Sequence, residues 1–336
     1  MTRGLLLVNL GTPLSSDVRD VRAFLGEFLM DRYVLDVPWL LRRLIVTGFI
    51  LPFRPNQTAR AYAKIWNAAG PETGSPLLHY SELCRHGVEE RTGMPTALAM
   101  RYGTPSVRDA IAALLGHGVR QITMLPLYPQ HADSTITTSI EAVRRSLPTN
   151  VSLTVVPPFY SQPDYLDAQA AAIRENLPAS WDHLLFSYHG LPERHITKAD
   201  PTGNHCLALE NCCQIPSEAH ATCYRHQVYR TSELLAQRLG LSEDQYSVSF
   251  QSRLGRLPWL TPYTDQVLEA LPGKGVRRLA VTCPAFVADN LETLEEIGIA
   301  GRESFLAAGG ESFSLVPCLN DRADWIDAIV RIAGAA

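Results

Sequence analysis

Cysteines are concentrated in one stretch of this chain, HCLALENCCQIPSEAHATCYRH, which runs from His205 to His226. It holds four of the seven cysteines, and an odd total argues against a framework made only of disulfides. Four thiolates are the ligand set of a [2Fe–2S] cluster, whereas structural zinc sites usually have C-x2-4-C knuckles, which adjacent cysteines do not supply. The pattern favours a metal site and leaves the cluster, zinc and no metal open. The cysteines are Cys206, Cys212, Cys213 and Cys223, with His205, His220 and His226 as alternative ligands.

A histidine stands at the end of an apolar run in SYHGLPERH (Ser187–His195). The run predicts a buried strand that breaks into a loop at His189, and open α/β sheets bind ligands at the carboxyl ends of such strands. A neutral imidazole with a pKa of about 6.5 can accept a proton or bind a metal there. From position alone, His189 is either such a group or a hydrogen-bonded structural histidine.

Acidic side chains gather in ADNLETLEEIG (Ala288–Gly298). Glu292 and Glu296 are spaced i, i+4 and therefore share one face of a helix. Asp289 stands where a helix N-cap would, and Glu292 follows it at the capping-box spacing. A structural role would make Glu292 part of the helix cap and the other glutamates a solvated acidic face. A functional role is the alternative: because like charges at this spacing repel, a cation or a proton is expected close to them.

Three further loops follow expected strands and carry aromatic side chains: QSRLGRLPWLTPY (Gln251–Tyr263), RYGTP (Arg101–Pro105) and LPLYPQ (Leu125–Gln130). Trp259 in the first loop could lie flat on a planar ligand, although a loop tryptophan more often covers the core. Together with the histidine and the glutamates, these loops describe a cleft with aromatic walls and an acidic patch opposite.

The elements that must position these residues alternate between short apolar runs and longer amphipathic ones, as in parallel α/β folds. A length of 336 residues predicts two domains of about 150 residues each. Strands are expected at Gly4–Leu10, Gln121–Leu127, Ser152–Val156, His183–Tyr188, Tyr246–Phe250 and Leu279–Thr282. Helices are expected at Asp17–Leu29, Ser106–Leu115, Thr135–Ser146, Tyr165–Glu175, Arg230–Leu239, Thr264–Leu271, Leu291–Ala307 and Ala323–Ala333.

The two halves of the chain repeat two patterns. LLLVNLGTP (Leu5–Pro13) and LLFSYHGLP (Leu184–Pro192) are both apolar strands that run into G-x-P. TMLPLYPQHADS (Thr123–Ser134) and VTCPAFVADN (Val281–Asn290) both read as strand, proline, aromatic residue and Ala-Asp. The repetition favours two similar α/β halves that face each other across a cleft.

Composition and hydropathy exclude some classes of function. The net charge of −4 lacks the basic footprint of a nucleic-acid binder. The N-terminal run MTRGLLLVNLGTP is too short for a signal peptide, so we expect a cytosolic protein. Arg42 and Arg43 interrupt the apolar stretch VPWLLRRLIVTGFILPF (Val37–Phe53), which is therefore not a transmembrane helix. It is either a packed helix or an interfacial patch with its arginines at the lipid headgroups.

The chain resembles ferrochelatase, the terminal enzyme of haem synthesis, over essentially its whole length. LLLVNLGTP, FLMDRYV, MRYGTP, LYPQ, FSYHGLP, QSRLGRLPWLTP and CPAFVADNLETLEEI occur in the order and approximate spacing of that family. The resemblance implies two similar Rossmann-like, chelatase-type α/β domains whose parallel sheets face a central porphyrin cleft. It places the first half at 1–160, with an apolar lip at about 34–55 and the C-terminal helix 320–336 joined to it. The second half is expected at 161–319, with a cysteine-rich insertion at about 200–226.

The resemblance also implies insertion of Fe²⁺, as a substrate, into protoporphyrin IX without a nucleotide or redox cofactor for the chemistry. His189 matches the family's catalytic histidine and would accept a pyrrole proton or bind the iron. Glu292 matches the catalytic glutamate and Glu296 the acidic residue behind it, and such oxygen donors suit transient Fe²⁺ binding. Substrate contacts are expected from Arg101, Tyr102, Tyr128, Gln130, Ser134, Trp259 and Lys64.

The chain departs from many relatives in two places. Asp289, Asn290, Leu291 and Glu292 stand where animal and Bacillus members read D-H-I-E, so that second histidine is absent. The cysteine-rich stretch resembles an internal segment of a bacterial subset, which implies a [2Fe–2S] cluster on the four cysteines. The apolar lip implies peripheral contact with the inner face of the cytoplasmic membrane, and the family includes both monomers and homodimers.

Three other functions stay open at this point. Coproporphyrin III could replace protoporphyrin IX, although its extra propionates would need more basic contacts. A cobalt or nickel chelatase of the same fold would be expected to surround its metal with more histidines. The third is a non-catalytic module that senses haem or an iron–sulfur cluster.

Overall fold

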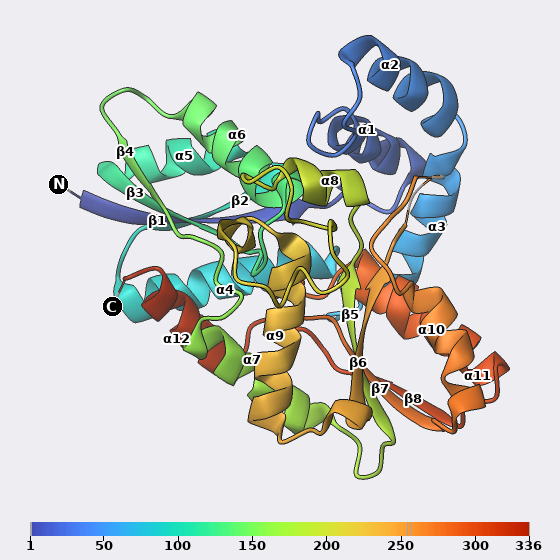
Figure 1. The fold of residues 1–336 in the computed structure, drawn as a ribbon. Coiled ribbons are helices and arrows are strands. Elements are labelled where there is room, and N and C mark those ends of the chain that lie inside the picture. The colour runs from blue at the N-terminus through green and yellow to red at the C-terminus, as the bar shows by residue number, and fades with distance from the viewer. Residues whose placement is uncertain (1, 254, 256, 336) are drawn as a thin grey trace. The chain divides into compact units, whose positions relative to one another are not determined.

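The computed structural model describes residues 2–253, 255 and 257–335, so Leu254 and Arg256 of the QSRLGRLPWLTP motif lie outside it. The chain forms two compact units. The first contains residues 2–128, 133–157 and 320–335, and the second contains 129–132 and 158–319. Each unit is built on one four-stranded parallel sheet (Figure 1). The expected α/β class with two similar halves is therefore confirmed.

The first sheet has the strand order β2-β1-β3-β4. Its strands are β1 (Thr2–Gly11), β2 (Thr96–Tyr102), β3 (Val119–Pro126) and β4 (Ser152–Val155). Its helices are α1 (Val18–Leu29), α2 (Trp39–Leu44), α3 (Arg54–Ile65), α4 (Pro76–Thr92), α5 (Val107–Gly116), α6 (Thr138–Ser146) and α12 (Ala323–Ile332), with π-helices at Ile45–Ile50 and Asp133–Thr137.

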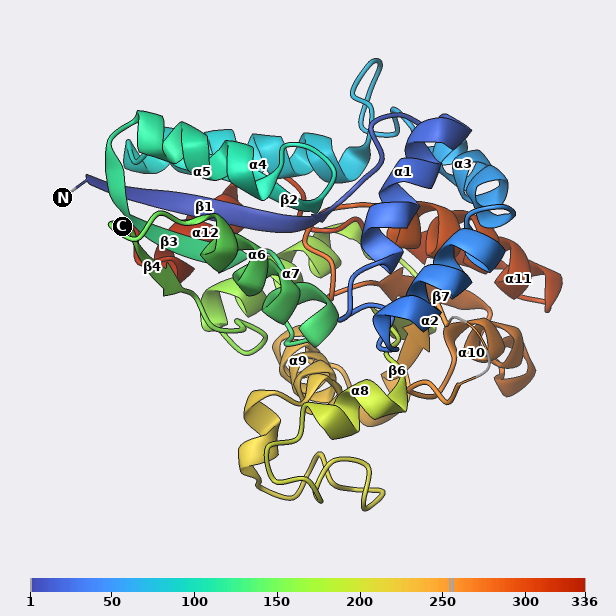
Figure 2. The same ribbon diagram turned by 90° about the horizontal axis from the view of Figure 1, so that it is seen from above.

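Helices cover both faces of this sheet. The run Leu5–Val8 in β1 is fully buried, as expected for a central parallel strand. α5 and α6 pack on one face, while α4 and α12 lie on the other and pack against each other (Figure 1). α1 packs against α3 beyond the carboxyl end of β1, with α2 beside them (Figure 2). Within the described residues, no helix is long and apolar enough to cross a membrane.

The second sheet has the order β6-β5-β7-β8. Its strands are β5 (His183–His189), β6 (Tyr246–Gln251), β7 (Arg278–Thr282) and β8 (Ser312–Leu315). Its helices are α7 (Pro163–Asn176), α8 (Glu193–Lys198), α9 (Tyr224–Leu239), α10 (Thr264–Ala270) and α11 (Arg302–Ala307), with a π-helix at Glu292–Gly301 and short 3-10 turns at Glu218–Ala221, Glu243–Gln245 and Pro272–Lys274. α7 and α9 lie on one face, and α10, α11 and the π-helix on the other (Figure 1).

The two units share one topology, which agrees with the repeated patterns in the sequence. In both, the first strand lies between the second and the third, and the fourth forms an edge. A glycine in close contact with the neighbouring strand ends β1 (Gly11) and directly follows β5 (Gly190). A Cβ added to Gly11 would lie 1.8 Å from the Tyr102 carbonyl oxygen, and one added to Gly190 would lie 2.9 Å from that of Gln251. Only glycine allows these approaches without displacement of the backbone.

Several elements differ from the expectation. β2, β8, α3 and α4 were absent from the expected set. β2 and β8 show no clean two-residue alternation, whereas the buried residues of α3 do follow a helical spacing that the prediction missed. α9 begins at Tyr224, earlier than expected, because the Cys223 sulfur accepts the His226 N–H and caps the helix. The helix expected at Leu291–Ala307 is a π-helix that continues into α11.

Candidate active site

His189 is the last residue of β5 and lies in the second unit. Its Nδ1 is 2.6 Å from the Gly190 carbonyl oxygen, and because a carbonyl can only accept, Nδ1 carries the proton. The lone pair of the neutral ring is then on Nε2, which has no hydrogen-bond partner in the described part of the chain. The rings of Trp259 and Phe286 flank the imidazole, each 6.5 Å away between centroids. His189 can therefore accept a proton in apolar surroundings.

Glu292 is the first residue of the π-helix, in the same unit as His189. Burial raises the pKa of its carboxyl group, the charge of His189 opposes that rise, and the nearby Glu296 carboxylate adds to it. A carboxyl group with a raised pKa can exchange protons closer to neutral pH than an exposed glutamate does. The structure thus brings the histidine and glutamate into electrostatic contact.

The predicted capping role of Asp289 is wrong, since its neighbour caps the helix. The Asn290 Oδ1 accepts the N–H groups of Glu292 and Thr293, at 2.9 and 3.1 Å. Asp289 instead accepts the Thr293 hydroxyl and the Cys318 N–H, and so ties this turn to the strand end that follows β8. An asparagine amide oxygen can accept the first N–H groups of a helix as well as a carboxylate can, and at position 290 it lies within hydrogen-bond distance of two of them.

Glu296 lies one turn further along the π-helix. Both of its carboxylate oxygens are bound by Ser252, one by the backbone N–H at 2.8 Å and the other by the hydroxyl at 2.6 Å. The side chain is thus anchored to the loop after β6.

Arg101 and Tyr102 end β2 in the first unit, where both are bound to one carboxylate. The Arg101 guanidinium and the Tyr102 hydroxyl both donate to Asp31, as does Thr138 at 2.6 Å. Burial alone would raise the pKa of Asp31, but the hydrogen bonds and the Arg101 charge outweigh it and lower that pKa. Asp31 was not among the predicted site residues, although it lies in the FLMDRYV motif, where an aspartate within an apolar helix end was the available signal.

The remaining predicted substrate contacts are divided between the two units. Tyr128 is buried and Ser134 partly buried in the first unit, and Lys64 is exposed on α3. Gln130 is buried in the second unit, where its amide donates to Thr231 at 3.0 Å. Trp259, in the same unit as His189, lies beside the histidine.

The four clustered cysteines lie in an irregular segment between α8 and α9 (Figure 2). All are free thiols. The thiols of Cys213 and Cys206 both donate to the Cys223 sulfur, and the bond from Cys213 lowers the pKa of Cys223 to about 6. Cys212 is close enough to Cys206 and Cys213 to raise the pKa of each. The segment therefore gathers all four sulfurs without forming a disulfide.

N–H groups point at these sulfurs. The backbone N–H of Leu207 lies 3.4 Å from the Cys212 sulfur, and the Arg225 guanidinium is 3.5 Å from both adjacent cysteine sulfurs. The buried Asp200 carboxylate binds the N–H groups of His205 and Cys206, each at 2.8 Å. These bonds organise the segment around the sulfur atoms.

The three nearby histidines bind backbone carbonyls. His205 and His220 contact the Cys212 carbonyl oxygen, and His226 contacts that of Cys213. The His220 and His226 rings are stacked, with 3.6 Å between centroids. Among the described residues, no group of three or more His, Cys, Asp and Glu side chains is arranged to hold a metal ion.

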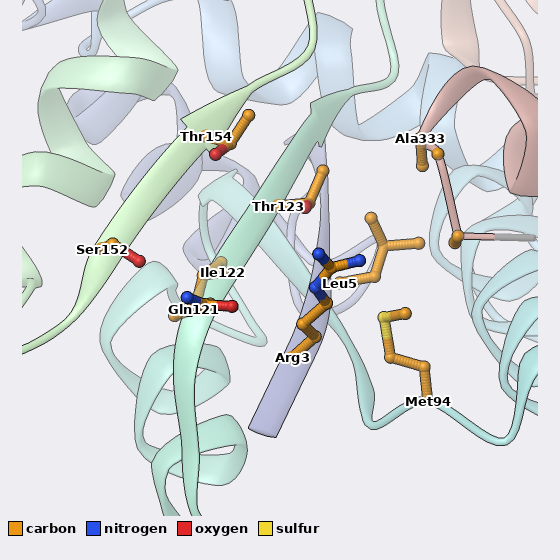
Figure 3. Close-up of a pocket in the computed structure, with 11 residues that line it drawn as sticks. Arg3, Leu5, Met94, Gln121, Ile122, Thr123, Ser152, Thr154 and Ala333 are labelled. Carbon is orange, nitrogen blue, oxygen red and sulfur yellow. The ribbon is translucent and has the colours of Figure 1, made fainter. Parts of the chain in front are cut away.

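Two surface cavities lie away from these groups. One of about 360 Å³ opens at the amino ends of β1, β3 and β4, where Arg3, Gln121 and Thr154 line it (Figure 3). The other, of about 440 Å³, adjoins α10 in the second unit. Neither contains a predicted site residue.

Comparison with known proteins agrees with this fold and chemistry. The family model described as Ferrochelatase matches residues 2–335. The ferrochelatase of Stutzerimonas stutzeri is 52% identical over 339 residues, which cover 99% of this chain and 98% of that protein. The ferrochelatase of Azotobacter vinelandii is 53% identical over 333 residues, covering 98% and 97%.

Solved structures support the fold alone. SirB from Bacillus subtilis with Fe³⁺ has a TM-score of 0.57 at 11% identity and covers 99% of this chain and 95% of that one. The sirohydrochlorin chelatase SirB in complex with cobalt has a TM-score of 0.55 at 8% identity, covering 99% and 94%.

Two α/β units of one topology, together with these matches over nearly the whole chain, identify the protein as a metal chelatase. The chain belongs to the ferrochelatase family. It is a lyase, a porphyrin metal chelatase whose reaction inserts Fe²⁺ into protoporphyrin to give protohaem.

Proposed function

We propose that His189 and Glu292 carry the ferrochelatase chemistry in this chain. Metallation requires the loss of two pyrrole N–H protons and the removal of water from Fe²⁺. The observation that carries the proposal is the contact of Nδ1 with the Gly190 carbonyl, which leaves the Nε2 lone pair to accept a pyrrole proton. The apolar rings of Trp259 and Phe286 exclude water from that side.

Glu292 takes the complementary role. Its carboxylate form can bind Fe²⁺, and because burial raises its pKa, the carboxyl group also keeps a proton to higher pH than an exposed glutamate does. Glu296 is held by its two hydrogen bonds to Ser252 and is proposed to act on Glu292 through its negative charge, which raises the pKa of the Glu292 carboxyl group. Trp259 and Tyr128 are proposed to contact the porphyrin ring, and Arg101 and Tyr102 to form an anchored polar pair. The proposed contacts to its propionates or rim are Gln130, Ser134 and Lys64.

The rate of Fe²⁺ insertion into protoporphyrin IX by substituted proteins tests these roles. His189→Ala and Glu292→Gln are each expected to lower kcat by about 10² to 10⁴. His183→Ala is the matched control, since His183 begins the same strand and binds Ser247 at 2.8 Å. Its kcat should stay near that of the wild type. A His189→Ala protein that metallates porphyrin at the full rate would refute the proposed mechanism.

The cysteine segment is proposed to hold a [2Fe–2S] cluster on Cys206, Cys212, Cys213 and Cys223. Four converging thiols fit this group, and N–H donors aimed at the sulfurs are the contacts that tune such clusters. In such a cluster each iron is bound by two cysteines. A structural zinc site would instead need at least three side chains around one ion, and the described residues show no such group. A cluster of this type transfers one electron when bound.

A visible absorption spectrum of the purified protein tests the cluster. Red-brown charge-transfer bands that dithionite bleaches, with two irons per chain, are expected. Cys213→Ser should remove the bands, whereas Cys84→Ser should keep them, because Cys84 is buried in the other unit. A colourless protein with stoichiometric zinc would exclude the cluster.

The apolar lip is proposed to contact the inner face of the cytoplasmic membrane peripherally. Its exposed side chains include Leu40 and Phe53, each 75% exposed, and Phe49, 66% exposed. Such side chains insert into the interface of a bilayer without crossing it. The expected placement of both arginines at the headgroups is wrong for Arg42, which is buried and donates to the Met30 carbonyl at 3.2 Å.

Sedimentation with vesicles of phosphatidylglycerol and phosphatidylethanolamine tests this contact. The triple change Leu40→Ser, Phe49→Ser and Phe53→Ser is expected to weaken binding at least about tenfold, since each side chain contributes apolar burial. Leu257→Ser is the control, because Leu257 is 50% exposed outside the lip. Equal binding by the triple variant and the control would exclude this surface.

A further inference from the structure

We propose that the dipeptide Gln251–Ser252 is a positioning element that sets the separation between the His189 imidazole and the Glu292 carboxyl group. The inference rests on the roles proposed for those two residues. Neither Gln251 nor Ser252 contacts the imidazole or the Glu292 carboxyl in the interactions described above; they hold the backbone on both sides.

Gln251 joins the histidine strand to the glutamate helix. It is the last residue of β6 and lies in register with His189, and its carbonyl oxygen accepts the Gly190 N–H at 2.8 Å. Its side chain, 3% exposed, accepts the Ser187 hydroxyl at 2.6 Å and donates to the Glu292 carbonyl oxygen at 3.2 Å. A fully bonded buried amide of this kind permits little relative movement of the groups it joins.

Ser252 fixes the same helix one turn later. Its φ is +67°, a left-handed conformation that is uncommon for residues other than glycine. In this conformation both its N–H and its hydroxyl meet the Glu296 carboxylate. The strained backbone conformation therefore allows Ser252 to make two hydrogen bonds to the Glu296 carboxylate.

These contacts form a bracket from the histidine loop to the π-helix. Its three links are Gly190 to the Gln251 carbonyl, Gln251 to the Glu292 carbonyl, and Ser252 to the Glu296 carboxylate. The rate of proton transfer is sensitive to the placement of the reacting groups, and a shift of about 1 Å can lower it by 10²-fold. Loosening the bracket should therefore lower kcat and leave porphyrin affinity largely unchanged.

The test compares Gln251→Leu with Gln169→Leu. Gln169 is a buried glutamine on α7 in the same unit, with its amide bound to Thr282. Gln251→Leu loses two buried hydrogen bonds and Gln169→Leu loses one, at 3.4 Å, so the melting temperature of each variant is measured first. Below both melting temperatures, Gln251→Leu is expected to lower kcat by about 10- to 100-fold with KM for protoporphyrin within about twofold. Gln169→Leu should keep the wild-type kcat.

A second variant and a second readout keep the inference falsifiable. If Gln251→Leu does not fold, Ser252→Ala, which retains the backbone N–H, should lower kcat by about three- to tenfold. In both variants the loss should fall on kcat, with KM for protoporphyrin within about twofold of the wild-type value. A kcat loss no greater than that of Gln169→Leu, or a loss that appears in KM instead of kcat, would overturn the inference. Full activity of His189→Ala would instead overturn the proposed function.

Discussion

The Glu292 carboxyl group lies where burial favours its neutral form, and this has a thermodynamic consequence. Its pKa is raised in the folded protein, so the unfolded chain releases the proton at lower pH than the folded one. Wild-type stability therefore falls as pH rises from the ordinary glutamate pKa towards the folded value. Function and stability oppose each other at this residue.

Glu292→Gln should make the protein more stable while it removes activity. At about pH 3, well below the ordinary glutamate pKa of about 4.3, the two proteins should be equally stable, because Glu292 is then almost fully protonated in both states of the wild type. At pH 7.5 the variant should gain on the order of 1 kcal/mol, since no charge is then buried. Urea denaturation at both pH values measures the difference. A variant less stable than the wild type at pH 7.5 would contradict the raised pKa.

Residue types at strand ends were predictable, whereas their partners were not. His189 follows directly from an apolar run that ends in HGLP. Asp31 is far from Arg101 in the sequence, and Gln251 acts through the backbone carbonyl of Glu292. Such partners depend on how distant segments pack, and no local pattern in one sequence records that.

At the scale of elements, α9 connects the cysteine segment to the end of β5, where His189 lies, within the second unit. Cys223 caps the helix, and the next residue, Tyr224, donates its hydroxyl to the His189 carbonyl at 2.8 Å. The start of the same segment follows α8, which begins just after the histidine loop. The histidine is therefore held from the helix side as well as from β6.

Tyr224→Phe removes the hydrogen bond to the His189 carbonyl oxygen, and its effect should be seen in kcat. Loss of one buried hydrogen bond should cost about 1 kcal/mol of stability and lower kcat by roughly three- to tenfold, with little change in KM. Tyr165→Phe is the control, because Tyr165 also donates to a backbone carbonyl, that of Pro284, at 2.6 Å. Equal kcat values for the two variants would exclude a role for Tyr224 in placing His189.

The π-helical form of Glu292–Gly301 was beyond sequence reasoning. The i, i+4 glutamates predicted a helix correctly but not its wider winding. Asn290 caps the helix locally, whereas the contact of Ser252 with Glu296 joins residues 44 positions apart, which no local pattern records.

At the scale of the whole molecule, the central strands were predicted and the edges less well. β1, β3, β5 and β7 contain continuous apolar runs typical of buried parallel strands. β8 reads SFSL and lies at a sheet edge, where the polar residues hide the strand signal. Because the strands are short, much of the buried apolar surface comes from the helices that pack on both faces of each sheet.

The repeated glycine at the end of each first strand gives a test of the shared topology. Gly11→Ala should cost about 4 kcal/mol or more, because its Cβ would overlap the Tyr102 carbonyl oxygen. Gly93→Ala should cost only about 1 kcal/mol, since it has positive φ but nothing within 4 Å of the added atom. Urea denaturation of both variants measures this, and similar losses would contradict the close approach at Gly11.

The lip described above also affects how the purified protein behaves in water. Side chains as exposed as Leu40 and Phe53 are attracted to any apolar surface, including the lips of other copies. Without lipid or detergent, self-association that rises with protein concentration is the expected colloidal behaviour. The oligomeric state is therefore best measured on the lip triple variant, whose remaining association would come from another interface.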